Sequence, residues 1–189
     1  MSKRNPIPDN AKRVFEGKIF EVWQWEQKMF DGSVEIFEKL KRPNTAVAIP
    51  IIGDKILVQT QEQPDSLKPF SSLPGGRCDK GEDFLSAAKR ELLEETGYES
   101  DDWTLWKEID PVGKIEWTFY AYIARNCVKK QDPHLDAGEK IITRLVDFEE
   151  FLMLSEDPSF SEKELAVYLI RARFDSKAKE ELYNLLFQK

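Results

Sequence analysis

The chain has 189 residues, of which 41% are hydrophobic and 33% are charged, a composition that suits one well-packed domain with a small appendage. Its net charge of −7 argues against broad binding to nucleic acids or anionic membranes, although local cations or a metal could hold a highly charged small substrate. Two cysteines and one histidine are too few for a disulfide framework or a zinc cluster, so we expect reduced thiols.

The first ten residues, MSKRNPIPDN, contain no apolar segment after their basic residues, and we therefore expect no signal peptide. No stretch of the sequence reaches the roughly 18 apolar residues that a membrane-spanning helix needs. These two observations predict a cytoplasmic protein.

Two strand pairs are predicted in the first third of the chain. Residues 13–30 are rich in Phe, Val, Ile and Trp, and residues 31–33, Asp-Gly-Ser, separate them from the strand-like run 34–40. This pattern is typical of a β-hairpin around an Asp-Gly turn. Residues 45–52 and 55–60 predict a second pair, made of buried central strands around Gly-Asp.

Pro43 and Asn44 separate the two strand pairs, which predicts a division of the chain. We expect an N-terminal antiparallel β appendage over residues 1–44 and a larger domain over residues 45–189. Residues 61–81 hold three prolines and three glycines, a composition that favours a structured loop.

A helix is predicted from Asp83 to Thr96, with Asp83 as its N-cap. Gly97 is placed to be its left-handed C-terminal cap, and Tyr98 to make the accompanying apolar contact. Further on, residues 115–124 are strand-like.

The pattern becomes helical beyond residue 146, where Asp147 and Ser161 are the expected caps. Ser161 and Glu164 have the spacing of a capping box. Strands that are interrupted by one long helix and followed by helices predict a mixed-sheet α/β domain.

The predicted helix carries three glutamates in the stretch RELLEETG, residues 90–97. Glu91, Glu94 and Glu95 fall within an arc of about 100°. Like charges so placed cost roughly 0.2–0.5 kcal/mol per pair. One interpretation is a solvated acidic patch that Arg90 partly neutralises.

The helical wheel favours another interpretation, because apolar residues lie on or beside the side that carries the glutamates. These residues are Phe84, Ala87, Ala88 and Leu92, whereas Leu93 does not fit the pattern. Carboxylates at the border of a packed face repel one another, so either their pKa values rise or a cation lies between them. Ligands that offer only oxygen favour Mg²⁺ or Mn²⁺.

Three glycines precede the helix, two of them adjacent at Gly75 and Gly76 and the third at Gly81. They permit a tight bend that can turn a backbone carbonyl toward a metal ion. The tetrapeptide LPGG is on its own equally typical of a plain turn.

The stretch from Gly76 to Tyr98 resembles the Nudix box, the signature of the Nudix hydrolases. The matching positions are Gly76, Glu82, Arg90, Glu91, Leu92, Glu94, Glu95, Gly97 and Tyr98, with no departure from the pattern. The resemblance implies an α/β/α sandwich with a mixed sheet. It also implies hydrolysis of a nucleoside diphosphate linked to another group, with one to three Mg²⁺ or Mn²⁺ ions as cofactors.

Roles for individual residues follow from the same resemblance. The metal ligands would be Glu91, Glu94, Glu95 and the carbonyl of Gly75, and Arg90 and Glu82 would brace the loop against the helix. Some members use a further glutamate about forty residues past the box to bind metal or orient the attacking water. Glu139 is the first candidate for that role and Asp136 the second. The predicted catalytic set is therefore Glu91, Arg90 and Glu139.

Residues 14–52 resemble the N-terminal segment of ADP-ribose pyrophosphatases and related nucleotide-sugar hydrolases. In those enzymes the β appendage exchanges across a homodimer and supplies aromatic side chains to the base, which implies a homodimer here. Phe20, Trp23 or Trp25 would then stack on the base, the alternative for each being ordinary packing in the strands or the dimer.

Gln61 and Gln63 are further candidates for substrate binding. They belong to the stretch QEQPD, which stands where the relatives often carry an arginine-rich segment and which contains no cation. In addition, Pro111 is 13 residues past the box, whereas the downstream proline of the subgroup is about fifteen residues past it. The nucleotide sugar could thus differ from ADP-ribose.

Two alternatives to a nucleotide-sugar hydrolase remain. One is a binding module of the same fold that holds a nucleotide without cleaving it, although the box of such proteins is usually damaged. The other is a nucleoside triphosphate pyrophosphohydrolase, which has the same chemistry but a different substrate.

Overall fold

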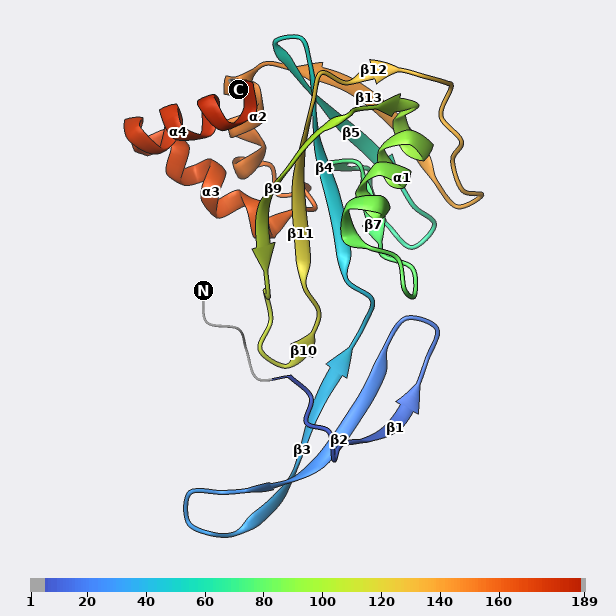
Figure 1. Ribbon diagram of the computed structural model, residues 1–189, viewed down its shortest axis with the longest axis vertical. Helices are drawn as coiled ribbons and strands as arrows, with labels where there is room; N and C mark the ends of the chain where they lie inside the picture. The colour runs from blue at the N-terminus through green and yellow to red at the C-terminus, as the bar shows by residue number, and fades with distance from the viewer. Residues whose placement is uncertain (1–5, 188–189) are drawn as a thin grey trace.

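A four-stranded sheet forms the N-terminal part of the computed structural model, which describes residues 6–187 (Figure 1). The sheet has the order β1-β2-β3-β10, and its strands are β1 (Lys12–Glu16), β2 (Glu21–Lys28), β3 (Val34–Lys41) and β10 (Ile115–Glu116). β2 and β3 form an antiparallel hairpin, as predicted. The predicted strand over residues 13–30 is instead two strands, because the chain turns where Gly17 N–H donates to the carbonyl of Phe20.

The N-terminal sheet projects away from the rest of the molecule (Figure 1). Its fourth strand, β10, comes from beyond residue 44 and pairs in parallel with β3. The proposed division at residue 44 stays a prediction, and residues 1–5 and 188–189 of the two predicted parts lie outside the described residues.

The larger sheet has the order β13-β5-β4-β11-β9, with the short strands β6 and β7 paired to β5 and β4. β4 and β5 form the predicted second hairpin, and β11 lies parallel to β4 and antiparallel to β9, so the sheet is mixed. The strands are β4 (Thr45–Ile52), β5 (Lys55–Glu62), β6 (Phe70–Ser72), β7 (Gly75–Arg77), β9 (Asp102–Ile109), β11 (Phe119–Arg125) and β13 (Lys140–Val146). β8 (Tyr98–Glu99) and β12 (Val128–Lys129) pair with each other.

Helices cover both faces of the larger sheet, which confirms the predicted α/β/α sandwich (Figure 1). One face carries α1 (Phe84–Thr96), and the other carries α2 (Phe148–Met153), α3 (Lys163–Phe174) and α4 (Ser176–Phe187). A short 3-10 helix, Leu154–Glu156, follows α2. Over residues 6–187, no helix is long and apolar enough to cross a membrane.

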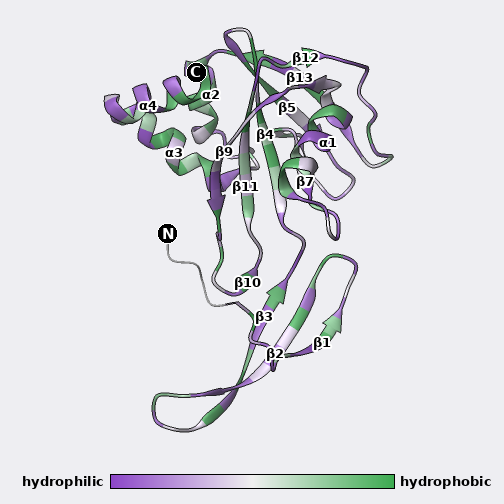
Figure 2. Cartoon of the chain, in the orientation of Figure 1, coloured by the Kyte–Doolittle hydropathy of each residue, from purple (hydrophilic) through white to green (hydrophobic). Residues whose placement is uncertain are grey.

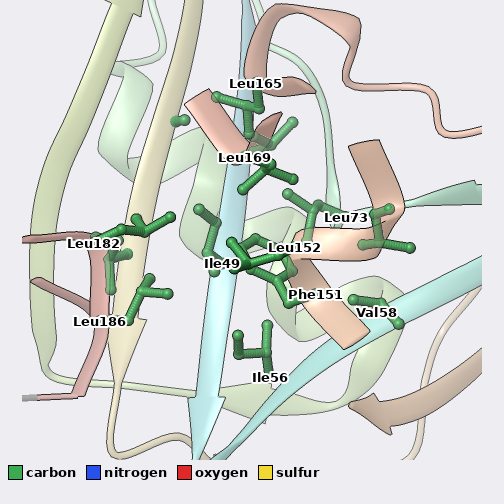
Figure 3. Packing of buried hydrophobic residues seen from close by; sticks show 14 of the residues in the cluster. Ile49, Ile56, Val58, Leu73, Phe151, Leu152, Leu165, Leu169, Leu182 and Leu186 are labelled. Atoms are coloured by element: carbon green, nitrogen blue, oxygen red, sulfur yellow. The ribbon is translucent and has the colours of Figure 1, made fainter. Parts of the chain in front are cut away.

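The central strands β4 and β11 are buried on both faces, and Figure 2 shows the hydrophobic residues concentrated along them. Alternate side chains of a strand point to opposite faces. On one face, Ile49 of β4 joins residues of α2, α3 and α4, including Phe151, Leu169 and Leu186 (Figure 3). This cluster is the main hydrophobic core.

The opposite face of the sheet carries small residues where it meets α1. Ala46 and Ala48 of β4 pack against Ala87, Ala88 and Leu92 of the helix. Because alanine side chains are short, the helix axis can lie close to the sheet, and one side of α1 is held firmly. The wheel-based prediction of a packed α1 face is therefore confirmed.

Both predicted caps of α1 are present. The Asp83 side chain accepts hydrogen bonds from the backbone N–H groups of Leu85 and Ser86, each at 3.1 Å. Gly97 is left-handed, with φ +72°, and its N–H donates to the carbonyl of Leu93 at 2.8 Å. The helix thus begins and ends where the sequence predicts.

Replacing Gly97 with alanine should destabilise the fold by more than about 2 kcal/mol. A non-glycine residue at positive φ costs roughly 1–2 kcal/mol, and a Cβ at Gly97 would lie 2.0 Å from the backbone oxygen of Gln131. Gly53→Ala is the matched control, because Gly53 also has positive φ, +62°, but open space around a Cβ. Urea unfolding measures both variants, and equal losses of unfolding free energy would contradict the steric argument.

The predicted caps beyond residue 146 have different outcomes. Asp147 caps α2 in a full capping box with Glu150, as its side chain accepts from the Glu150 N–H at 2.8 Å. The capping box predicted for Ser161 and Glu164 is wrong, since α3 begins at Lys163 after Glu162 and has no side-chain cap. Ser161 instead donates its hydroxyl to the Glu162 carboxylate at 2.7 Å, because that carboxylate is buried and needs donors.

Candidate active site

Two adjacent glycines bring the chain between β4 and helix α1. β7 pairs with the start of β4, with Gly75 opposite Val47 and Gly76 opposite Ala46. A Cβ on Gly75 would lie 2.6 Å from the carbonyl oxygen of Ala46, and a Cβ on Gly76 would lie 2.5 Å from Oε1 of Glu91. The backbone can therefore pass this close to the sheet and to a glutamate only without side chains.

Glu95 is the most buried of the three helix glutamates, with 4% of its surface exposed. Its Oε2 accepts hydrogen bonds from the N–H of Gly75 at 3.0 Å and from Nε2 of Gln59 at 2.9 Å. Burial raises the pKa of Glu95 to about 8 despite these two bonds, and the negative charges of Glu91 and Glu139 add to the shift. A nearby cation would offset the energetic cost of ionising Glu95 in this buried position.

Arg90 holds the other two glutamates and ties the helix to the preceding loop. Its Nη1 contacts Oε1 of Glu91 at 2.8 Å and Oε2 of Glu94 at 3.0 Å. Its Nε and Nη2 form a bidentate pair with Glu82, at 3.0 and 3.1 Å, and Glu82 in turn accepts from the N–H of Asp79. These contacts have the geometry of the bracing pair inferred for Arg90 and Glu82.

The two ends of this network differ in their electrostatics. Burial raises the pKa of Glu91, although Arg90 opposes the shift. The hydrogen bond from Arg90 lowers the pKa of Glu82 and raises that of Arg90 itself. Arg90 therefore compensates the charge of Glu82 well and that of Glu91 only in part.

The donor atoms of the glutamate cluster fit a hard divalent cation. Glu91 and Glu95 offer carboxylate oxygens, the ligands that Mg²⁺ and Mn²⁺ prefer, and a cation would offset the burial that raises the pKa of both groups. Nevertheless, within the described part of the chain no three Asp, Glu, His or Cys side chains are grouped closely enough to hold an ion together. Glu94 stands apart, since its side chain is 46% exposed and is bound to Arg90.

The loop before β13 brings Glu139 toward the cluster. Its negative charge contributes to the raised pKa values of both Glu91 and Glu95, after the larger effect of burial. The N–H of Glu139 donates to the carbonyl of Asp136 at 3.0 Å, and Asp136 is exposed. The loop is also tied to α1, because the N–H of His134 donates to the carbonyl of Glu94 at 2.7 Å. Of the two acidic candidates in the loop, Glu139 is the one whose charge reaches the glutamate cluster.

A cavity of about 350 Å³ reaches Gly75, the glycine whose N–H binds Glu95, although the three glutamates do not line it. Gln61 and Gln63 line it, as do residues that sequence analysis did not single out, namely Arg42, Trp117, Glu162 and Glu164. The Arg42 guanidinium lies 4.8 Å from the centre of the Trp117 ring, and its Nε is buried without a hydrogen-bond partner among residues 6–187. Arg42 thus contributes a positive charge to the wall of this cavity and carries an unsatisfied buried N–H.

The predicted aromatic residues lie elsewhere. Phe20 is 41% exposed and its ring centre is 5.9 Å from the Arg42 guanidinium. Trp23 donates its Nε1 to Glu21 at 2.7 Å and lines a separate cleft of about 890 Å³ between the N-terminal sheet and the loop before α1. Trp25 packs against Phe37 in the same N-terminal sheet. The structure therefore brings Gln61 and Gln63 to the cavity, whereas neither Trp23 nor Trp25 lines it.

Comparison with known proteins gives one family. A model of the NUDIX domain matches residues 41–167. A methanol dehydrogenase activator from Bacillus methanolicus is 27% identical over 125 residues, 65% of this chain and 67% of that protein. An ADP-ribose pyrophosphatase from Bacillus subtilis is 27% identical over 149 residues, 77% of this chain and 80% of that protein.

Two further matches cover nearly the whole chain. The ADP compounds hydrolase NudE from Escherichia coli is 24% identical over 179 residues, 90% of this chain and 94% of that protein. A crystal structure of an ADP compounds hydrolase superposes with a TM-score of 0.72 at 22% identity, covering 94% of this chain and 98% of the other. At that identity the structural match is evidence for the fold.

Proposed function

Because the chain belongs to the Nudix family, we propose that it is a metal-dependent pyrophosphohydrolase that cleaves the diphosphate of a nucleoside diphosphate sugar, with ADP-ribose as the first candidate. The products would be a nucleoside monophosphate and a sugar phosphate. The observation that carries the proposal is the complete box, folded so that Glu95 is buried, Glu91 is mostly buried, and Gly75 joins them to a cavity.

Glu91, Glu94, Glu95 and the carbonyl of Gly75 would hold Mg²⁺ or Mn²⁺. When bound, such an ion neutralises the diphosphate and lowers the pKa of the attacking water. Glu139 would accept the proton of that water, since it is the loop carboxylate whose charge reaches the cluster. The contacts of Arg90 with Glu82 and Glu91 would keep the loop and the helix in register.

The cavity favours a substrate with one diphosphate and an uncharged hydroxylated group. Among the described residues that line it, Arg42 is the only cation, whereas Glu162 and Glu164 carry carboxyl groups. Gln61 and Gln63 add neutral donors and acceptors that suit hydroxyl groups. A third phosphate would meet further carboxylates here, and a nucleoside triphosphate is therefore the weaker alternative.

A panel of nucleotides tests the proposal. ADP-ribose, other nucleoside diphosphate sugars and ATP are each incubated with Mg²⁺, with Mn²⁺ or with a chelator, and the products are separated by chromatography. We expect cleavage of a diphosphate sugar with either ion, little pyrophosphate release from ATP, and no turnover with the chelator. Nucleotide binding without cleavage of any compound would support a binding module instead.

We also propose that residues 1–44 contact a second copy of the chain. Large apolar side chains of the N-terminal sheet and its turns are exposed, namely Val14, Phe15, Ile19, Phe20, Val34 and Ile36. Such a surface is typical of a protein–protein interface. Light scattering is expected to give about 44 kDa, twice the chain mass of 22.0 kDa, and a mass of 22 kDa would refute the dimer.

A further inference from the structure

Three glutamines form a chain of hydrogen bonds that ends on Glu95. Gln59 and Gln61 lie on the same face of β5, two residues apart, and Gln63 follows just after the strand. Nε2 of Gln63 donates to Oε1 of Gln61 at 3.4 Å, and Nε2 of Gln61 donates to Oε1 of Gln59 at 2.7 Å. Nε2 of Gln59 then donates to Oε2 of Glu95 at 2.9 Å.

Glu95, the last acceptor in this row of hydrogen bonds, determines which way each glutamine amide points. The ionised form of Glu95, which a cation requires, only accepts hydrogen bonds, so Gln59 must turn its NH₂ group toward it. Its oxygen then faces Gln61, which must in turn present its own NH₂ group, and Ser72 Oγ donates to the same oxygen at 3.2 Å. Each glutamine side chain therefore has one orientation when Glu95 is ionised.

The hydrogen-bonded glutamines connect the cavity to the glutamate cluster. Gln61 and Gln63 line the cavity, whereas Gln59 is fully buried and makes no contact with it. A buried amide in a strand is costly unless every polar group is satisfied. Holding Glu95 in one orientation would explain why an amide is buried at position 59.

We propose that Gln59 and Gln61 are positioning residues that hold the Glu95 carboxylate in one orientation for the divalent cation. A substrate that contacts Gln63 and Gln61 would extend the same row of hydrogen bonds. Filling the cavity would therefore restrict the orientation of the Glu95 carboxylate further. This inference relies on the proposed function only in taking Glu95 as a ligand of the cation.

Near-isosteric methionine variants test the inference through Mn²⁺ affinity, measured by calorimetry on the full chain. Gln59→Met removes the donor to Glu95 and should weaken Mn²⁺ binding by about tenfold or more, within the range known for residues that orient metal ligands. Gln61→Met should weaken it less, because Gln59 remains. Thr60→Val, between them on the opposite face of β5, is the matched control and should bind as the unaltered chain does.

Non-additivity separates positioning from general damage to the fold. Gln59→Met should add nothing in a Glu95→Gln background, and the double variant of Gln59 and Gln61 should be no worse than Gln59→Met alone. If Gln59→Met does not fold, as judged by thermal unfolding, Gln61→Met decides the matter. Additive losses, or Mn²⁺ affinities equal to that of Thr60→Val, would overturn the proposal.

The outcome is separable from that of the proposed function. If the unaltered chain binds Mn²⁺ but cleaves no nucleotide sugar, the proposed function fails, and the affinity series still tests the glutamines. If the unaltered chain cleaves its substrate while both methionine variants bind Mn²⁺ normally, only the positioning role is refuted. Failure of the unaltered chain to bind Mn²⁺ at all would refute the positioning role as well.

Discussion

Glu95→Gln is expected to lower kcat by at least about 10³-fold while leaving the fold intact. A glutamine oxygen can still accept the hydrogen bonds that the N–H of Gly75 and Nε2 of Gln59 now donate to Oε2. What the variant loses is the negative charge, which a divalent cation at this cluster would require. The loss should therefore appear in metal affinity and turnover rather than in stability.

Steady-state kinetics with the preferred substrate, together with calorimetric titration of Mn²⁺, would measure both effects. Glu99→Gln is the control, because Glu99 lies just past the helix in an exposed ion pair with Lys130. Glu94→Gln should fall between the two, since Glu94 is bound to Arg90 at the exposed edge of the cluster. Undiminished turnover in Glu95→Gln would refute the assignment of the metal ligands.

Local sequence signals predicted the part of the site that is local in the chain. Helix α1 begins after Asp83 and ends at Gly97 because a cap side chain and a left-handed glycine act over a few residues. The two glycines before it indicate a tight bend for the same reason. The glutamate cluster and the contacts of Arg90 are therefore predictable from the sequence.

Residues that long-range topology assembles were not predictable in this way. Arg42 and Trp117 meet because β11 lies parallel to β4, and Glu162 reaches the cavity because α3 starts beside the end of β6. β9 and β13 were also missed, since their side chains are partly exposed and lack a long apolar run. A single sequence does not specify which strands become neighbours.

The helical wheel also gives Glu91, Glu94 and Glu95 similar positions, whereas the structure places them in different environments. All three lie on one arc of α1, but Glu95 faces β5 and β7, where Gln59 and Gly75 cover it. Glu94, one residue earlier, has a side chain that is 46% exposed and is held by Arg90 instead. A wheel gives direction around the helix axis, whereas burial depends on which strand lies opposite.

Glu162→Gln is expected to stabilise the protein at pH 8 by up to about 3 kcal/mol. Burial raises the pKa of Glu162 from 4.5 to about 7, although hydrogen bonds from Ser161 and from the N–H of Leu73 oppose the shift. A raised carboxyl pKa means that the folded state favours the protonated form. Its stabilising contribution is therefore complete below pH 4.5 and is lost as the pH rises through 7.

The size of this effect follows from the shift, because each pKa unit corresponds to about 1.36 kcal/mol. A glutamine at this position can accept from the N–H of Leu73 with its oxygen, and its NH₂ group can donate to the Ser161 hydroxyl, so both present contacts survive without a charge. Urea unfolding at pH 5 and pH 8 measures the difference. The gain should be large at pH 8 and small at pH 5.

Glu164→Gln provides the matched control, because Glu164 is less buried and lines the same cavity two residues along. It should shift stability less, since a carboxylate that is only partly buried loses less of its hydration on folding. An equal gain in both variants would mean that the net charge of the cavity is responsible, and not the burial of Glu162. A loss of stability at pH 8 in Glu162→Gln would show that the ionised carboxylate is favourable in the folded state.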